Sequence, residues 1–374
     1  MFTLVRVRLP VIFGRYSGTM AATPPAKANE GTVTDEVTVA EGANDRSNTP
    51  NIIRPLDERD QQDLMTKFRG FQTGLIRVGE IGHLIPFHQT AYLKEYFNFR
   101  FREEDVLVMT FPRSGTTWTQ EIVWLMKHRV DVDAAQATRL DDRVPFLEFD
   151  ALQPPDVVEG GKDGGVFLEM AKNLDNPRTI KTHLPFSLLH PGILNTCKVV
   201  YVARNPKDVC VSYYHQQRLV TLAEFLGTFP EYVDFWCRDL LLQAPYWGHI
   251  AEGWARRHHR NVLFLLYENM KKDLLSELRR LNTFLETGLT EEELQKIAKF
   301  TSFESMKNRT STNPMVEAQE AGRFKKGTTG DWINHFTPDL EDKFNIWLAK
   351  GGHLAKEIPF TYHSGNPQSQ GPLV

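Results

Sequence analysis

The chain has 374 residues, of which 41% are hydrophobic and 11% aromatic, so it is neither fibrous nor disordered along its whole length. Its 44 Lys and Arg against 47 Asp and Glu give a formal net charge of −3, which excludes a bulk positive field for wrapping nucleic acid. The three cysteines lack paired or metal-ligand spacing, which favours a reducing compartment. No apolar run reaches the roughly 18 residues that cross a bilayer, so we expect neither a nucleic-acid nor a membrane partner.

The two ends of the chain are expected to lie outside the folded domain. Residues 1–29 contain four basic and no acidic residues, which fits a disordered leader of a cytoplasmic protein or, alternatively, an organelle import signal. Residues 21–51 contain no aromatic residue, Leu, Ile or Met, so they cannot bury enough apolar surface to offset their ordering entropy. The predicted organisation is a disordered leader over 1–51, one folded domain over 52–362 and a polar tail over 363–374.

Between these limits, apolar runs of strand length alternate with helix-patterned segments, which predicts an α/β fold with a central parallel sheet flanked by helices. Four predicted strands matter for function because each ends in polar or basic residues. They cover residues 105–110, 179–182, 198–203 and 261–267. Ligands of parallel α/β sheets bind at the carboxyl ends of the strands, so we expect these four ends to converge on one site.

The first strand end, residues 111–117, leads into an apolar helix predicted over 118–127. Such a small-residue turn exposes backbone N–H groups at the positive end of a helix dipole, and its Ser and Thr hydroxyls add donors. The spacing is not that of a Walker A loop, because the basic residue precedes the glycine, and no strand ends in an aspartate for magnesium. No His, Cys or carboxylate group has zinc-ligand spacing. The segment predicts a phosphate site without a metal, with a turn that merely caps the helix as the alternative.

The third strand end supplies a second candidate phosphate contact. Arg204 follows the strand, Asn205 suits an N-cap, and Pro206 suits the first position of the next helix. Ser212 lies about two helical turns further on and can face the same phosphate as Arg204. The run 323–329 (RFKKGTT) adds a third group of cations. Taken singly, these residues fit a surface salt bridge or a solvated charge patch, but together they predict a ligand with more than one phosphate.

Five sequence blocks resemble the cytosolic sulfotransferase family in order and spacing, within a match that spans about residues 106–344. The blocks are FPRSGTTW at 111–118, VPFLEF at 144–149, KTHLP at 181–185, YVARNPKD with SYYH at 201–208 and 212–215, and KG with GDW at 326–332. The resemblance implies a single α/β domain with a P-loop-like phosphosulfate loop. It also implies a sulfuryl donor, 3′-phosphoadenosine 5′-phosphosulfate (PAPS), a product nucleotide, 3′-phosphoadenosine 5′-phosphate (PAP), and no metal.

The resemblance assigns roles to individual residues. The phosphosulfate loop would consist of Arg113, Ser114, Gly115, Thr116, Thr117 and Trp118. The contacts to the 3′-phosphate would be Arg204, Ser212, Phe324, Lys325, Lys326 and Gly327. The adenine contacts would be Trp118, Tyr267, Thr301, Phe303 and Met306. The acceptor site would consist of Phe146, Phe149, Lys181 and His183, with His183 as the catalytic base.

Elementary chemistry agrees with these roles. An attacking hydroxyl must lose its proton, and histidine is the usual group that accepts it near neutral pH. Negative charge builds on the departing nucleotide, so the cations Lys181 and Arg113 should stabilise the transition state. Lys181 and His183 lie two residues apart, which on a regular strand places both side chains on one face. We expect direct in-line transfer without a covalent enzyme intermediate.

The sequence departs from the family pattern at several positions. Arg113 replaces the usual lysine of the phosphosulfate loop, keeping the charge but adding bulk and a bidentate fork. The family's Arg-Lys-Gly stretch is Lys325-Lys326-Gly327 here, a milder change. Of the family's dimer motif, which aligns with residues 333–342, only Thr337 remains, so a monomer and a homodimer both stay open.

A glycine-rich stretch at residues 160–165 follows Phe149 and is expected to reshape the acceptor site. Phenols, sterols, other alcohols and amines are all candidate acceptors, and sulfation followed by elimination, as in retinol dehydratase, is an alternative.

Two other functions compete with a sulfotransferase. A magnesium-dependent nucleotide kinase would prefer ATP with magnesium, whereas a catalytically weak or silent family member would bind PAPS or PAP without transfer.

Overall fold

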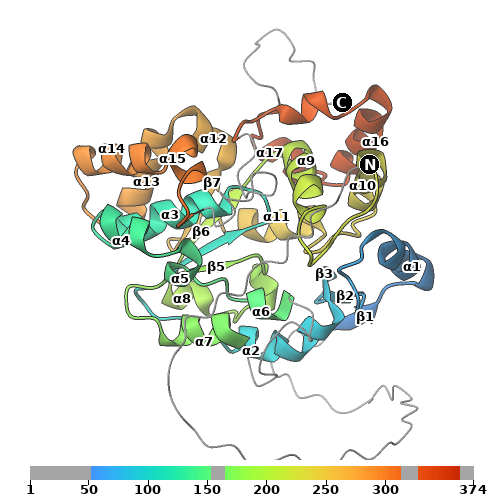
Figure 1. Cartoon of the computed structure of the whole chain (residues 1–374), viewed down its shortest axis with the longest axis horizontal. Helices are drawn as coiled ribbons and strands as arrows, with labels where there is room; N and C mark the ends of the chain where they lie inside the picture. Colours follow the sequence, from blue (N-terminus) through green and yellow to red (C-terminus); the bar gives the residue numbers. More distant parts are fainter. Residues whose placement is uncertain (1–51, 153–164, 313–326, 363–374) are drawn as a thin grey trace, which may run out of the picture. The chain divides into compact units, whose positions relative to one another are not determined.

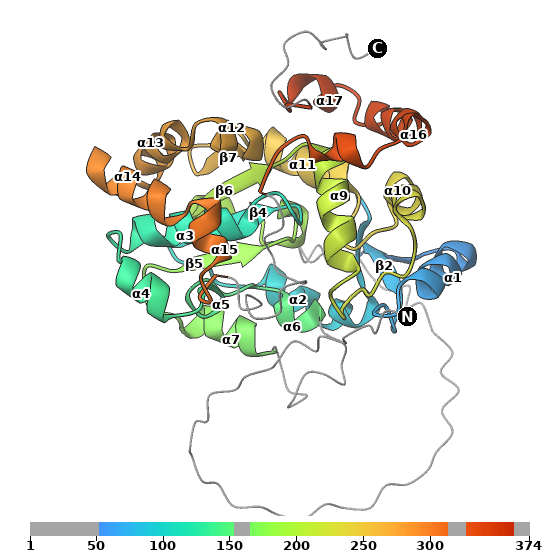
Figure 2. The ribbon, with the colours of Figure 1, turned by 45° about the horizontal axis from the view of Figure 1, so that its top comes forward.

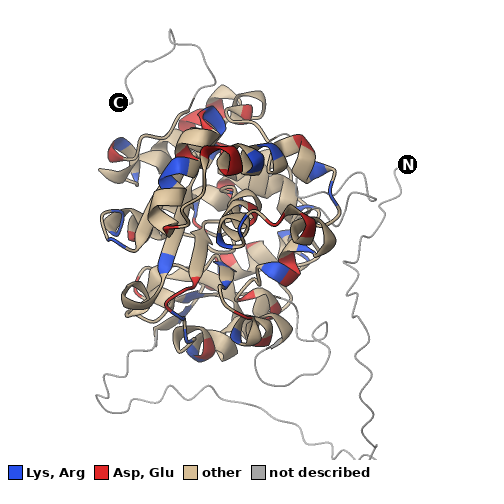
Figure 3. Ribbon diagram, turned by 90° about the vertical axis from the view of Figure 1, so that its left-hand side faces the viewer, with Lys and Arg blue, Asp and Glu red and all other residues tan. Residues whose placement is uncertain are grey.

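We describe residues 52–152, 165–312 and 327–362 of a computed structural model of the chain. The expectations for the leader and the polar tail, and for Phe324, Lys325 and Lys326, lie outside these residues. Figure 1 shows the described part as a sheet surrounded by helices, and Figure 2 shows the same ribbon turned by 45°. None of the helices in the described ranges has the length and apolar character that a membrane crossing requires. Figure 3 shows acidic and basic residues interspersed over the described ribbon.

The central sheet has four parallel strands in the order β5-β4-β6-β7, which confirms the predicted α/β class. The strands are β4 (Val106–Thr110), β5 (Thr179–Thr182), β6 (Lys198–Ala203) and β7 (Val262–Leu266). Two of the four match their predicted bounds, and the other two are shorter by one residue at one or both ends. Parallel strands are covered on both faces and therefore read as continuous apolar runs, which is why the sequence pattern located them.

Helices cover the two faces of the sheet, and the alternating residues of β4 divide between two cores. Leu107 and Met109 belong to a core shared with α9 (Pro206–Gln217), α10 (Phe229–Cys237), α11 (Tyr246–Ala255) and α16 (Pro338–Ala349). Val106 and Val108 belong to the other, shared with α3 (Thr116–Lys127), α13 (Leu274–Leu285) and α14 (Glu291–Phe300). The period of two along a strand produces this division.

The remaining helices complete the described part. They are α1 (Glu58–Lys67), η1 (Phe87–Tyr92), α2 (Leu93–Phe97), α4 (Val132–Ala137), α5 (Leu140–Arg143), α6 (Phe149–Leu152), α7 (Gly165–Asn173), η2 (Phe186–Leu188), α8 (Ile193–Thr196), α12 (Tyr267–Lys272), α15 (Phe303–Lys307), η3 (Asp331–Asn334) and α17 (Leu354–Glu357). The N-cap prediction is confirmed at α9, where the Asn205 side chain accepts a hydrogen bond from the Lys207 N–H and Pro206 opens the helix.

A second, antiparallel sheet was not predicted from the sequence. It contains β1 (Ile53–Pro55), β2 (Leu75–Val78) and β3 (His83–Pro86) in that order. Gly79 and Gly82 in the β2–β3 turn both have positive φ angles, of 74° and 77°. The strands are only three or four residues long, so their pattern is too short to distinguish them from loops. Backbone hydrogen bonds join β3 to the segment before α11, through Leu84 to Gln243 and Ala244.

Candidate active site

The turn between β4 and α3 has an unusual backbone. Arg113 has a φ of 69° and Gly115 a φ of 99°, a region that side chains other than glycine rarely adopt. A Cβ atom added to Gly115 would lie 2.7 Å from Cδ2 of Tyr267, so the glycine is also required for close approach. The turn therefore brings its backbone directly against the ring that follows β7.

Unsatisfied donors collect at this turn. Helix α3 begins without a side-chain cap, which leaves its first N–H groups available to an anion. The hydroxyl of Ser114, Nε1 of Trp118 and Nε of Arg204 are buried and have no hydrogen-bond partner among the described residues. Buried donors normally have partners, so donors that converge on one turn indicate a ligand that supplies the acceptors. The donor set fits the phosphate oxygens of a nucleotide.

The residues predicted to contact the 3′-phosphate lie beside the same turn. Arg113 donates from Nε to the hydroxyl of Ser212 at 3.0 Å. Arg204 donates to the carbonyl oxygen of Arg113 at 3.1 Å and to that of Thr328 at 3.0 Å. The structure thus joins the ends of β4 and β6 to the segment that begins at Gly327. The guanidinium offers several fixed donors, one of which Arg113 uses to contact Ser212.

The predicted adenine contacts fall into two groups. The Arg204 guanidinium lies over the ring of Tyr267, with its Cζ atom 4.3 Å from the ring centre. The Tyr267 ring packs edge-on against Trp118, and the two ring centres are 5.9 Å apart. Thr301 is the C-cap of α14. Phe303 and Met306 lie on α15, which runs beside α3 in both views (Figures 1 and 2). A Cβ on Gly327 would lie 2.2 Å from the Phe303 ring, so the phosphate-contact segment packs directly on α15.

His183 is buried at the end of β5 and held in one tautomer. Its Nδ1 lies 2.8 Å from the carbonyl oxygen of Thr110, so Nδ1 carries the proton and donates it, while Nε2 keeps its lone pair. Burial, and secondarily the charge of Lys181, hold the pKa of His183 well below 6.5. The imidazole is therefore neutral at pH 7 and able to accept a proton. The hydroxyl of Thr110 contacts that of Thr116 at 2.7 Å, which links the histidine to the phosphate loop.

The acceptor residues predicted from the resemblance surround this histidine. The Lys181 ammonium lies 3.7 Å from the centre of the Phe146 ring, and that ring packs edge-on against His183 at 5.1 Å. Both side chains therefore pack against the Phe146 ring. The ring centre of Phe149 lies 5.8 Å from that of Phe146.

Two functional candidates were missed by the sequence reasoning. Glu148 is fully buried and accepts hydrogen bonds from the His183 N–H at 2.6 Å and the Thr182 hydroxyl at 2.8 Å. Burial raises the pKa of Glu148 to about 7 despite these hydrogen bonds. His249 donates from Nε2 to the carbonyl oxygen of His183 at 3.1 Å, and burial lowers the pKa of His249 to about 3, which keeps it neutral. Glu148 lies inside the VPFLEF block, which was a signal for it; His249 had none.

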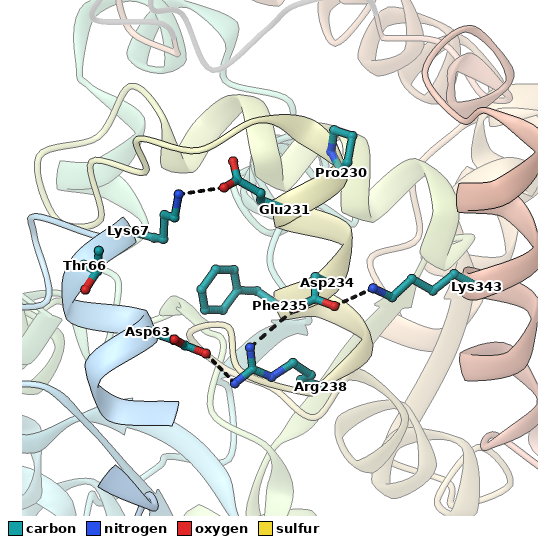
Figure 4. A pocket seen from close by; sticks show the side chains of 9 residues that line it. All are labelled: Asp63, Thr66, Lys67, Pro230, Glu231, Asp234, Phe235, Arg238 and Lys343. Atoms are coloured by element: carbon teal, nitrogen blue, oxygen red, sulfur yellow. Dashed lines mark hydrogen bonds and ion pairs between the residues drawn. The ribbon is translucent and has the colours of Figure 1, made fainter. Parts of the chain in front are cut away.

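A cavity of about 440 Å³ lies elsewhere, between α1, α10 and α16 (Figure 4). Its charged side chains pair with one another: Lys67 contacts Glu231 at 2.6 Å, Arg238 contacts Asp63 at 2.9 Å, and Lys343 contacts Asp234. None of its lining residues belongs to the predicted site, and the pairing leaves no excess charge for a ligand. Within the described ranges, no group of three His, Cys, Asp or Glu side chains is placed to hold a metal ion.

The architecture and the site define an α/β nucleotide-binding transferase, and three comparisons identify its family. Residues 103–355 match the model of the sulfotransferase domain. Rat sulfotransferase 1C2 is 38% identical over 262 residues, covering 68% of this chain and 85% of that protein. Luciferin sulfotransferase of Photinus pyralis is 34% identical over 294 residues, covering 74% and 79%. A crystal structure of retinol dehydratase with retinol and PAP superposes with a TM-score of 0.75 at 28% identity, covering 83% of this chain and 98% of that one.

The chain belongs to the cytosolic sulfotransferase family. Its members are PAPS-dependent transferases, and the unsatisfied donors at the β4–α3 turn fit the phosphosulfate of that donor. Bound PAPS supplies an activated sulfuryl group with PAP as its leaving group.

Proposed function

We propose that this protein transfers the sulfuryl group of PAPS to the hydroxyl or amine of a small hydrophobic acceptor, in the cytoplasm. One observation carries the proposal: a neutral, tautomerically fixed His183 hydrogen-bonds the same Thr110 that contacts the phosphate loop. This arrangement places a proton acceptor beside an anion cradle, which in-line transfer from a hydroxyl requires. The aromatic rings of Phe146 and Phe149 beside His183 favour an apolar acceptor.

In the proposed reaction, the Nε2 lone pair of His183 accepts the proton of the acceptor hydroxyl as its oxygen bonds to sulfur. The bond between sulfur and the bridging phosphate oxygen breaks, and PAP leaves with the negative charge. Lys181 and Arg113 stabilise that charge, since fixed cations in a water-excluded site require no reorganisation. Arg204, Ser212 and the segment at Gly327 hold the 3′-phosphate.

Two measurements test the proposal. Excess PAP should raise the melting temperature of the protein, whereas ATP with magnesium should not, because a ligand bound only by the folded state stabilises it. His183→Ala should abolish transfer while preserving the shift with PAP. Transfer at the wild-type rate in His183→Ala would remove the histidine from its role, and a protein that binds PAP but sulfates no phenol, alcohol or amine would be a silent member of the family.

A second candidate is transfer followed by elimination, favoured by the structural match to retinol dehydratase. In that reaction the C–O bond of an allylic sulfate ester breaks, sulfate leaves, and a neighbouring carbon loses a proton. Mass spectrometry of the products from an allylic alcohol distinguishes the two outcomes, because the ester retains the sulfuryl group and the elimination product has lost water overall.

A further inference from the structure

A row of aromatic rings extends from the candidate base to helix α7. Phe146 packs against His183, Phe149 lies 5.8 Å from Phe146, and Phe167 lies 4.8 Å from Phe149 at an interplanar angle of 60°. The first two rings were predicted from the family resemblance, but Phe167 was not. It comes from α7, beyond the glycine-rich stretch in which this chain departs from the family pattern.

Phe167 differs from the core aromatics in its surroundings. It is half-buried and belongs to neither of the two cores, although Leu168 next to it is fully buried in the core around α9 to α11. Phe149, its ring partner, is also half-buried, so part of the surface of each residue remains accessible. A half-buried pair of tilted aromatic rings beside a candidate catalytic group is typical of a surface that binds an apolar ligand.

A buried carboxylate holds the backbone at Phe167. Asp150, on α6, accepts a hydrogen bond from the backbone N–H of Phe167 at 2.7 Å and a longer one from that of Leu168 at 3.4 Å. The carboxylate thus acts as a cap at the start of α7 and ties it to α6, the helix that carries Phe149. The backbone at Phe167 is therefore held by a buried side chain, which sets where its ring begins relative to Phe149.

We propose that Phe167 determines acceptor specificity, by binding the distal part of an elongated apolar acceptor whose hydroxyl reacts at His183. This inference rests on the proposed function and refines it: the acceptor class is an alcohol or phenol with an extended hydrophobic body. A short phenol reaches Phe146 and Phe149 alone, while a long one continues along the row to Phe167. Asp150 is a positioning residue for this contact.

Such a contact acts on binding and not on chemistry. The row places Phe167 two rings away from His183, so it contacts neither the reacting oxygen nor the sulfuryl group. An interaction that is equal in the ground state and the transition state changes KM and leaves kcat unaltered. A loss of structure at the site would instead lower kcat for every acceptor.

The experiment compares two phenols that share a reacting group and differ in length, para-cresol and para-octylphenol, with wild-type protein and Phe167→Ala. We expect the wild type to bind para-octylphenol with the lower KM. In Phe167→Ala, the KM for para-octylphenol should rise about tenfold and that for para-cresol less than twofold, with kcat unchanged for both. Calorimetry of para-octylphenol with the PAP-loaded protein should show the same weakening of Kd without catalysis.

Two variants serve as controls. Phe167→Tyr keeps the ring and should retain the wild-type KM for both phenols. Val166→Ala truncates an exposed neighbour on the same turn of α7, 45% accessible, and serves as the variant without an effect on either KM. Equal KM values of the two phenols for the wild type, or equal effects of Phe167→Ala on both, would overturn the inference and leave the sulfotransferase proposal standing. A wild-type protein that transfers to neither phenol nor to any other acceptor would instead overturn the proposed function, and this inference with it.

Discussion

The charge of Lys181 should shift the pH range in which His183 can accept a proton. Lys181→Met removes the cation while keeping a side chain of similar length. The ammonium lies 3.7 Å from the Phe146 ring centre, which is 5.1 Å from that of His183, so the two groups are at most 8.8 Å apart. At an effective dielectric constant of about 20, two unit charges at that distance repel by about 2 kcal/mol, equivalent to rather more than one pH unit.

The sign follows from the chemistry of the imidazole. A neighbouring cation disfavours the protonated ring, so Lys181 lowers the pKa of His183, as burial does more strongly. Removal of the cation should raise that pKa and move the acid limb of the kcat/KM profile upward by about one pH unit. Wild-type activity should persist below pH 6.5, because the base is still neutral there.

The assay is the pH dependence of kcat/KM for a phenol, together with an NMR titration of the His183 ring. The rate at the plateau should also fall, because Lys181 is proposed to stabilise the leaving nucleotide, but the position of the limb is independent of that loss. Lys172→Met is the control, since Lys172 is an exposed lysine paired with Glu169 on α7. An acid limb that stays in place or moves to lower pH in Lys181→Met would refute the reasoning.

Two further predictions concern stability. Gly115→Ala places a Cβ atom at a backbone φ of 99° and against the Tyr267 ring. This variant should lose about 3 kcal/mol of unfolding free energy and the thermal shift with PAP. Gly288→Ala is the control, because Gly288 also has a positive φ but lies in open space, and it should cost only about 1 kcal/mol. Comparable urea midpoints for the two variants would contradict this. Glu121→Gln removes the carboxylate shared by the buried Arg143 and the partly buried Arg309, and should destabilise the fold by about 3–5 kcal/mol. The exposed Glu169→Gln should cost less than about 1 kcal/mol, with both variants measured by urea denaturation. A loss below 1 kcal/mol for Glu121→Gln would show that the two arginines find other partners.

The sequence by itself determined the central sheet and predicted that polar residues gather at the ends of its strands. Strands buried on both faces read as apolar runs, and the caps at α9 depend on adjacent residues, so both are local signals. The polar strand ends converge as expected: His183 after β5 contacts Thr110 of β4, and Arg204 after β6 contacts both the phosphate loop and Tyr267. Parallel topology places those ends together regardless of detail.

The tertiary structure alone decided the partners of these residues. Glu148 lies 35 residues from His183 in the chain, and Asp150 lies 17 residues from Phe167, so no local pattern pairs them. The antiparallel sheet β1-β2-β3 was not predicted for the same reason, because its short strands are defined by their pairing and not by a periodic sequence pattern. Residue identity thus predicted which groups are candidates for the chemistry, whereas the tautomer of the histidine and the place of Phe167 beside Phe149 depend on contacts that only folding creates.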